Sequence, residues 1–168
     1  MTNPDKLFIA EALVEKIRQH AAEEYPHECC GALLGRDSSS SEVQRESRQI
    51  LDLFPLVNRN GESPRNRFSV SPRDVIDAER VAQERGLDIV GWYHSHPDHP
   101  ARPSEFDREH AWPWYSYIIV SVRERVPQEM TSWRLNDNRD SYSEEVIEIA
   151  AVRLNDVDSQ GVKTSHGR

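Results

Sequence analysis

The first apolar pattern along the chain has the spacing of a helix. Ile9, Leu13, Ile17 and Ala21 recur every four residues, so a helix would present them on one face. Pro26 follows this pattern, and the residue before a proline avoids helical backbone angles. We therefore predict a helix with one buried face that ends before Pro26.

Shorter apolar runs further along the chain are typical of strands, because turn residues bound each of them. We predict strands over 30–35, 43–51, 67–70, 87–93, 115–122 and 128–135. The segment 144–154 fits a strand or a helix. Residues 58–66 are rich in Asn, Arg, Gly and Pro and are predicted to form an exposed loop.

Two more helices are predicted from their capping residues. The first opens with residues 71–74, where a serine caps, a proline takes the first turn and an aspartate lies three residues after the cap. It ends at Gly86. The second covers 104–111 and stops before Pro113. Helices interleaved with strands in this way indicate an α/β fold, with a sheet covered by helices.

The length of the chain, 168 residues, suits one domain with a short tail. We expect the domain to cover 1–154 and the polar segment 155–168 to be disordered. No apolar run approaches the roughly 20 residues that cross a bilayer, and the first residues lack the pattern of a signal peptide. A cytoplasmic protein without a membrane anchor is expected.

Charge and cysteine content exclude several kinds of function. The chain has 29 acidic and 21 basic residues and a net charge of -8, which argues against a general nucleic-acid coat. Its two cysteines, Cys29 and Cys30, are adjacent, so they provide neither a disulfide framework nor a cysteine zinc site. A reducing compartment fits this usage. Any metal must be held by His, Asp or Glu.

The stretch from His94 to Asp107 carries the candidate chemistry. His94 and His96 are two residues apart at the end of a predicted strand, so both side chains would point to one side, roughly 6.5 Å apart along the chain. Pro97 then stops the strand. Plain structural interpretations also exist: the histidines can be ordinary ones, and Ser104 has the spacing of a helix cap with Asp107. Ser104 can cap the helix while Asp107 points toward an ion.

If His94, His96 and Asp107 bind one ion, the donors are two nitrogens and one oxygen. Zinc accepts this set, and three protein ligands leave a fourth position for water, as in catalytic zinc sites. The water must still lose a proton to a base. A carboxylate elsewhere in the chain has to supply that base.

The same stretch resembles the JAMM metallopeptidases, which are built on the Mov34/MPN/PAD-1 (MPN) domain. That family has an upstream Glu, then His-x-His-Pro, six residues, Ser, two residues and Asp. The residues that match without a change of spacing are His94, His96, Pro97, Ser104 and Asp107. Upstream, 25–35 resembles the family's first helix-to-strand junction, with Glu28 as the glutamate. The resemblance covers roughly residues 5–150.

The resemblance implies a site and a fold. One zinc ion per chain would be held by His94, His96 and Asp107. Glu28 would orient and deprotonate the water, and Ser104 would donate a hydrogen bond to the developing oxyanion. The implied fold is α/β, a mixed β-sheet flanked by helices and similar to cytidine deaminase. The implied activity is that of a zinc metallopeptidase or isopeptidase.

The resemblance also implies a substrate. Compact bacterial members of this family are associated with ubiquitin-like sulfur-carrier proteins, whose C-terminus they trim to Gly-Gly or from which they release an amino acid such as cysteine. We therefore expect cleavage of an amide bond at the Gly-Gly tail of such a carrier or of its amino-acid adduct. The tail is expected to add a strand to a sheet edge, with the loop 58–66 as one wall. Neither nucleic acid nor membrane is an expected partner.

The motif also allows other interpretations. A non-catalytic MPN scaffold would lack the metal ligands, which this chain retains. Residues 94–99 also spell the HxHxDH signature of the metallo-β-lactamase fold, but that fold needs a longer chain and further downstream ligands. RadC-like proteins share His-x-His-Pro and have been linked to DNA repair, a role against which the acidic charge argues.

Three more residues are candidates for contact with the site. His99 is expected at its rim, and His110 lies three residues after Asp107 on the same helix face. Cys30 would share a strand face with Glu28, although a small buried cysteine is the commoner case. A nearby aromatic group is expected to lie in the core: Trp112, Trp114, Tyr115 and Tyr117.

Overall fold

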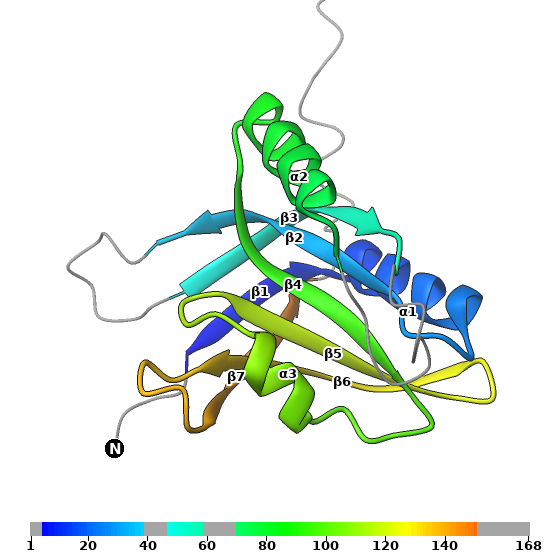
Figure 1. The fold of residues 1–168 in the computed structure, drawn as a ribbon. Coiled ribbons are helices and arrows are strands. Elements are labelled where there is room, and N and C mark those ends of the chain that lie inside the picture. Colours follow the sequence, from blue (N-terminus) through cyan, green and yellow to red (C-terminus); the bar gives the residue numbers. More distant parts are fainter. Residues whose placement is uncertain (1–4, 39–46, 59–69, 151–168) are drawn as a thin grey trace, which may run out of the picture.

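The computed structural model describes residues 5–38, 47–58 and 70–150. Their elements (Figure 1) are, in chain order, β1 Lys6–Ala10, α1 Glu11–Glu24, β2 Cys30–Asp37, β3 Ser47–Leu56, α2 Pro72–Glu84, β4 Asp88–Pro97, α3 Glu105–His110, β5 Ser116–Arg123, β6 Val126–Leu135 and β7 Tyr142–Ala150. Among these residues, no helix combines the length and the apolar character that crossing a membrane requires.

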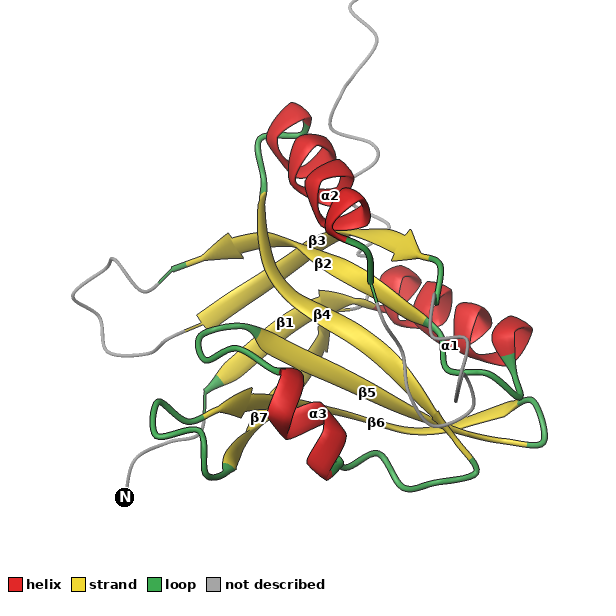
Figure 2. Ribbon diagram, in the orientation of Figure 1, coloured by secondary structure: helices red, strands yellow, loops and turns green. Residues whose placement is uncertain are grey.

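The strands form one closed barrel (Figure 2). Their order is β1-β3-β2-β4-β5-β6-β7, and β1 also pairs with β7. Strand β1 runs parallel to both of its neighbours and β4 runs parallel to β5, whereas the other pairs are antiparallel. The prediction of a mixed sheet with helices is confirmed. The closure into a barrel was not predicted, and the finer likeness to cytidine deaminase stays a prediction.

Helix α1 supplies part of the barrel core. Its buried face consists of Leu13, Val14, Ile17 and Ala21, and these side chains join apolar residues of β1 to β5 in one cluster. The predicted stripe and the end of the helix before Pro26 are therefore right. The start was wrong, because Ile9 belongs to β1. An isoleucine followed by apolar residues at helical spacing fits the period of a helix as well as that of a strand. Because of this ambiguity, the strand of five residues was not predicted.

Helices α2 and α3 lie outside this core. α2 packs Ala78 and Ala82 against β2, and its start and the short α3 both carry the predicted capping boxes. Gly86, which follows α2, has a φ of +66°, a value that glycine adopts without strain. α3 has six residues and none of them is buried, so its position depends on its cap and on neighbouring loops.

The strand predictions differ in quality. Those for 30–35, 87–93, 115–122 and 128–135 correspond to β2, β4, β5 and β6; β5 has the predicted length, shifted by one residue, and the other three are longer. The segment 144–154 is a strand as far as Ala150, where the description ends. The prediction of 43–51 was shifted, since β3 continues to Leu56. The loop 58–66 and the strand 67–70 lie almost wholly outside the described residues.

Candidate metal centre and active site

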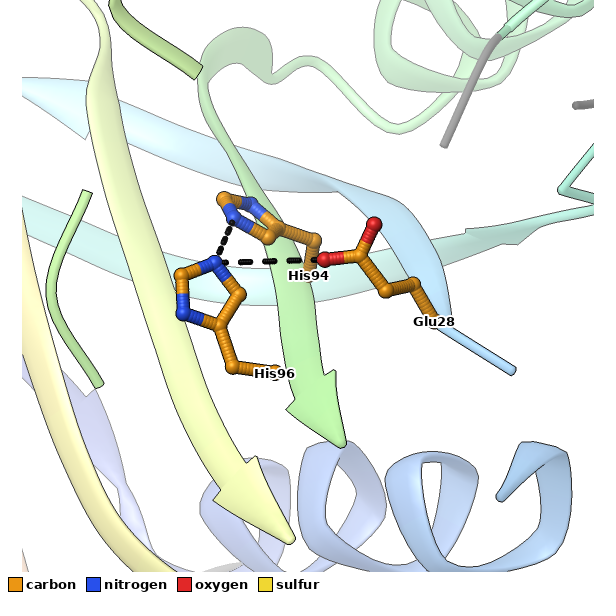
Figure 3. A group of neighbouring side chains, drawn as sticks. All are labelled: Glu28, His94 and His96. Carbon is orange, nitrogen blue, oxygen red and sulfur yellow. Dashed lines mark hydrogen bonds and ion pairs between the residues drawn. The ribbon is translucent and has the colours of Figure 1, made fainter. Parts of the chain in front are cut away.

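Strand β4 carries both candidate histidines to one point. The register places His94 beside Cys30 of β2 and Ile119 of β5. The Nε2 atoms of His94 and His96 lie 3.1 Å apart (Figure 3), and both side chains are buried. The two-residue spacing on a strand thus brings two imidazole nitrogens together inside the molecule.

Helix α3 brings a carboxylate to the same point. Asp107 Oδ2 lies 3.1 Å from Nε2 of His96 and 3.3 Å from Nε2 of His94. In the capping box, the Asp107 backbone N–H donates to Ser104 Oγ over 3.1 Å, and the Ser104 N–H donates to Asp107 Oδ2 over 2.8 Å. The helix cap and the approach to the histidines therefore coexist, and the cap orients the carboxylate.

The ring of His96 is fixed from outside the centre. Its Nδ1 lies 2.9 Å from the carbonyl oxygen of Pro100, and a carbonyl oxygen can only accept. Nδ1 therefore carries a proton, and Nε2 is the ring nitrogen that faces His94 and Asp107. Metal-binding histidines commonly have their second nitrogen held in this way.

Glu28 enters the centre from the residues just before β2. Its side chain is 2% exposed, and its Oε1 lies 3.9 Å from His96 Nε2 (Figure 3). Asn58 Nδ2 donates to the Glu28 carbonyl oxygen over 3.0 Å, and the next backbone N–H, of Cys29, donates to Ser95 Oγ over 2.8 Å. The backbone around Glu28 is thus tied to β4 between the two histidines.

The two carboxyl groups have opposite electrostatic environments. Burial, and secondly the charge of Asp107, raise the pKa of Glu28 to about 9. Burial acts on Asp107 in the same sense, but His94 and His96 outweigh it and hold the pKa of Asp107 below its usual range. Neighbouring acids with pKa values pushed apart are typical of functional sites.

The donor set fits a zinc ion. Zinc bonds of about 2.0–2.1 Å in a tetrahedron place neighbouring ligand atoms roughly 3.3 Å apart, which is close to the 3.1–3.3 Å that separate the donors of His94, His96 and Asp107. Glu28, His94 and His96 also have donors within 4.8 Å of one another. Glu28 Oε2 is buried without a hydrogen-bond partner among the described residues, an arrangement that a nearby cation would relieve.

The other predicted contacts are placed less centrally. His99 is exposed and engages Ser121 through its backbone carbonyl. His110 is exposed, donates from Nδ1 to the carbonyl oxygen of Phe106 over 2.8 Å and stacks on the Phe106 ring. Cys30 is buried next to His94 in the sheet, and burial raises the pKa of its thiol to about 12, so it is an inert thiol there.

A pocket that the sequence did not predict opens beside the centre. Its volume is about 790 Å³, and its lining comprises Val70, Val75, Trp92, His94, Phe106, Asp107, His110, Ala111, Trp112, Pro113, Trp114, Tyr115 and Tyr117. The expectation that the aromatic group lies in the core was wrong for the two tryptophans, because Trp112 is 66% exposed and Trp114 49%. Pro113 between them, which marks a loop, was the available signal.

Comparisons with known proteins identify a family and several relatives of this chain. A family model described as prokaryotic homologs of the JAB domain matches residues 10–136. The chain is 35% identical over 117 residues to a desampylase of Haloferax volcanii, which covers 69% of this chain and 78% of that protein.

Two further relatives show the same family. A probable TtuB-protein conjugate cleaving protease of Thermus thermophilus is 30% identical over 116 residues, covering 69% of this chain and 70% of that one. A CysO-cysteine peptidase of Mycobacterium tuberculosis is 28% identical over 144 residues, covering 85% and 90%. The chain therefore belongs to the prokaryotic JAB-domain family of JAMM-type peptidases.

Proposed function

We propose that this chain is a zinc-dependent isopeptidase that hydrolyses the amide bond after the C-terminal Gly-Gly tail of a ubiquitin-like carrier protein. The observation that carries the proposal is the convergence of His94, His96 and Asp107 within 3.1–3.3 Å, beside the buried Glu28. The names of two relatives, a conjugate-cleaving protease and a CysO-cysteine peptidase, support an amide bond to a carrier as the substrate.

The residues of the centre have distinct roles in this proposal. His94, His96 and Asp107 would hold the zinc, which when bound supplies an activated water and polarises the scissile carbonyl. Glu28 takes the proton of the attacking water and passes it to the leaving amine, roles for which its buried carboxyl group is placed, with Oε1 3.9 Å from His96 Nε2. Ser104 accepts a hydrogen bond in the cap, which leaves its O–H free to donate to the carbonyl oxygen as negative charge develops.

The leaving group defines two candidate reactions. Release of a lysine side chain would make the chain a conjugate-cleaving isopeptidase, and release of one amino acid would make it a carrier-trimming peptidase. The name of the Thermus relative favours the first, and that of the Mycobacterium relative favours the second. Both reactions share the Gly-Gly side of the bond, so one centre serves either.

The base is tested by Glu28→Gln. This change keeps the size of the side chain but removes its ability to accept a proton, so hydrolysis is expected to fall roughly 10²–10⁴-fold. Zinc content, measured by elemental analysis, is expected to stay at the wild-type level. Reduced zinc content would show that Glu28 is a metal ligand, and an active variant would show that the base lies elsewhere.

The substrate is tested with two matched carrier adducts. One ends in Gly-Gly before the bond and the other in Val-Val, both with the same lysine leaving group. Glycine lacks a Cβ and lets the carbonyl approach the buried centre, so only the first is expected to be cleaved. Equal cleavage of both, or rapid cleavage of unrelated unfolded peptides, would refute the carrier proposal. A chain that holds zinc and hydrolyses neither would be a binding scaffold.

A further inference from the structure

A fully buried arginine lies in the barrel wall and has no part in the centre described above. Arg48 of β3 is 0% exposed and lies beside Leu7 of β1 and Asp37 of β2 in the register. Its Nη2 donates to Asp37 Oδ2 over 3.3 Å. A buried charge is costly unless it is paired and hydrogen-bonded, so the contacts of its other nitrogen indicate what it does.

Those contacts lie on β4 and around the start of β5. Nη1 of Arg48 lies 2.6 Å from the carbonyl oxygen of Trp114, 3.0 Å from Ser116 Oγ and 2.9 Å from the Val90 carbonyl oxygen. The guanidinium carbon also lies 4.3 Å from the centroid of the Trp114 ring, a cation–π distance. Arg48 thus holds both the backbone and the ring of Trp114.

Trp114 has a backbone that needs such support. Its φ is +83°, in the left-handed region that bulky side chains rarely adopt and that persists only where the surroundings impose it. Its ring covers the guanidinium and yet is 49% exposed, and it lines the pocket that His94 and Asp107 also line. The ring therefore connects a buried charge with a surface next to the reaction.

We propose that Arg48 is a positioning residue for substrate binding, which holds Trp114 as the wall of a subsite for an apolar substrate side chain near the scissile bond. This inference rests on the proposed function above. The occupant is part of the substrate because the pocket is continuous with the centre, so whatever fills it lies beside the bond to be cut. Arg48 acts through Trp114 and touches neither zinc nor substrate.

The chemistry of the pocket selects an apolar occupant. Aromatic and aliphatic side chains dominate its lining, and its volume of about 790 Å³ is in the usual range for binding sites. Arginines already lie over two of its rings: Arg48 at 4.3 Å from the Trp114 ring and Arg139 at 5.8 Å from the Trp112 ring. A cationic side chain would add a second positive charge to the same rings, whereas an apolar one adds only contact area.

The test compares Arg48→Met, Trp114→Ala and the double variant. The probe is the reporter acetyl-Leu-Gly-Gly-aminomethylcoumarin, and acetyl-Leu-Gly-Gly amide serves for binding, which is measured by titration calorimetry because Trp114→Ala removes a tryptophan. Each single change is expected to raise KM and Kd about tenfold with kcat within about twofold and zinc content unchanged, because the binding lost is equal in the ground state and the transition state. In the double variant, KM and Kd are expected to be no higher than in the single variant that binds more weakly, since Arg48 and Trp114 act on the same wall of the subsite.

Two controls keep the proposal open to refutation. Arg134→Met removes another largely buried arginine, which pairs with Glu145 and does not line the pocket, and should leave KM and Kd unchanged. Unchanged KM and Kd in Arg48→Met, multiplied effects in the double variant, or an equal rise in Arg134→Met would each overturn the positioning role. If Arg48→Met does not fold, Arg48→Lys decides by the same comparison, because one ammonium cannot reach Trp114 and Asp37 as two nitrogens do.

The reporter and the binding assay separate the two proposals. A wild-type enzyme that fails to cleave the Gly-Gly reporter contradicts the proposed function. The Kd comparison needs no turnover, so it decides on Arg48 in either case. A matched peptide with Asp in place of Leu is expected to bind about tenfold more weakly to the wild type, and equal binding of both peptides would exclude an apolar subsite.

Discussion

At the scale of single residues, His96 has the most constrained position in the centre. Its Nδ1 proton points to the Pro100 carbonyl oxygen, while Nε2 faces His94, Asp107 and Glu28. Because the carbonyl oxygen fixes the tautomer, the loop after β4 decides which nitrogen is offered to a metal. Replacing His96 with glutamine would remove both the imidazole nitrogen offered to a metal and the control of its tautomer.

The metal site predicts a zinc content of about one ion per chain, since three converging donors make a catalytic-type site. The double variant His94→Ala/His96→Ala should contain almost none. Elemental analysis of protein purified without chelators or a metal-affinity tag measures both. His99→Ala is the matched control, because this exposed histidine contributes no contact to the centre in the structure and should leave zinc unchanged. A zinc content in the double variant equal to that of the wild type would contradict the assignment of His94 and His96 as zinc ligands.

At the scale of elements, α2 and α3 begin in the same way but with different consequences. Both have a serine cap and an aspartate three residues later, at Ser71 and Asp74 and at Ser104 and Asp107. α2 is also held by buried alanines, whereas α3 has no buried residue. The cap of α3 therefore has to orient a candidate metal ligand with little help from packing.

Ser104→Ala is expected to weaken zinc binding, and Ser71→Ala is not. Losing a serine cap costs about 1 kcal/mol of helix stability, which corresponds to roughly a fivefold rise in the zinc Kd if α3 must be formed for Asp107 to bind. Competition with a chelator measures the Kd. Urea unfolding should show that Ser71→Ala lowers the free energy of unfolding by a similar amount. A zinc Kd that is equal in the two variants would show that the cap of α3 does not orient Asp107.

The sequence could predict the elements of the site but not its surroundings. The spacing of His94, His96 and Asp107 follows from one strand and one helix, which local patterns reveal. The role of Arg48 depends on Val90 and Ser116, which come together only when the strands pair. Likewise, no local pattern tells which side of a loop an aromatic ring will face.

At the scale of the whole molecule, the closed barrel changes the expected mode of substrate binding. Each of the seven described strands has a neighbour on both sides, so none is left at an open edge of the sheet. The expectation that a substrate tail adds a strand to a sheet edge finds no edge among them. In the proposed reaction, loops and side chains such as Trp114 would therefore bind the tail, and the side chains of the tail would contribute more to its affinity.

Global stability should depend on His20, which hydrogen-bonds through Nδ1 to Tyr93 O–H over 2.8 Å. Burial lowers the pKa of His20 below 6.5, against the opposing charges of Glu24 and Glu23. The unfolded chain then binds a proton more readily, so the free energy of unfolding should fall as the pH drops through 6.5 toward the lower folded pKa.

His20→Gln isolates this contribution, because glutamine does not titrate. The fall in the free energy of unfolding between about pH 7.5 and about pH 5.5 should be smaller in the variant than in the wild type. Urea titrations followed by circular dichroism give both profiles. Parallel profiles would show that His20 has the same pKa in the folded and unfolded chain.

The position of β1 has a consequence for the order in which the protein is made. This first strand pairs with β3 and β7, so Lys6 lies opposite Val146 near the other end of the described chain. On the ribosome, β1 and the helix after it emerge long before their last partner exists. Contacts between such distant residues form late and slow the search for the native state. The nascent chain must therefore keep its first apolar residues soluble until nearly the whole domain has been synthesised.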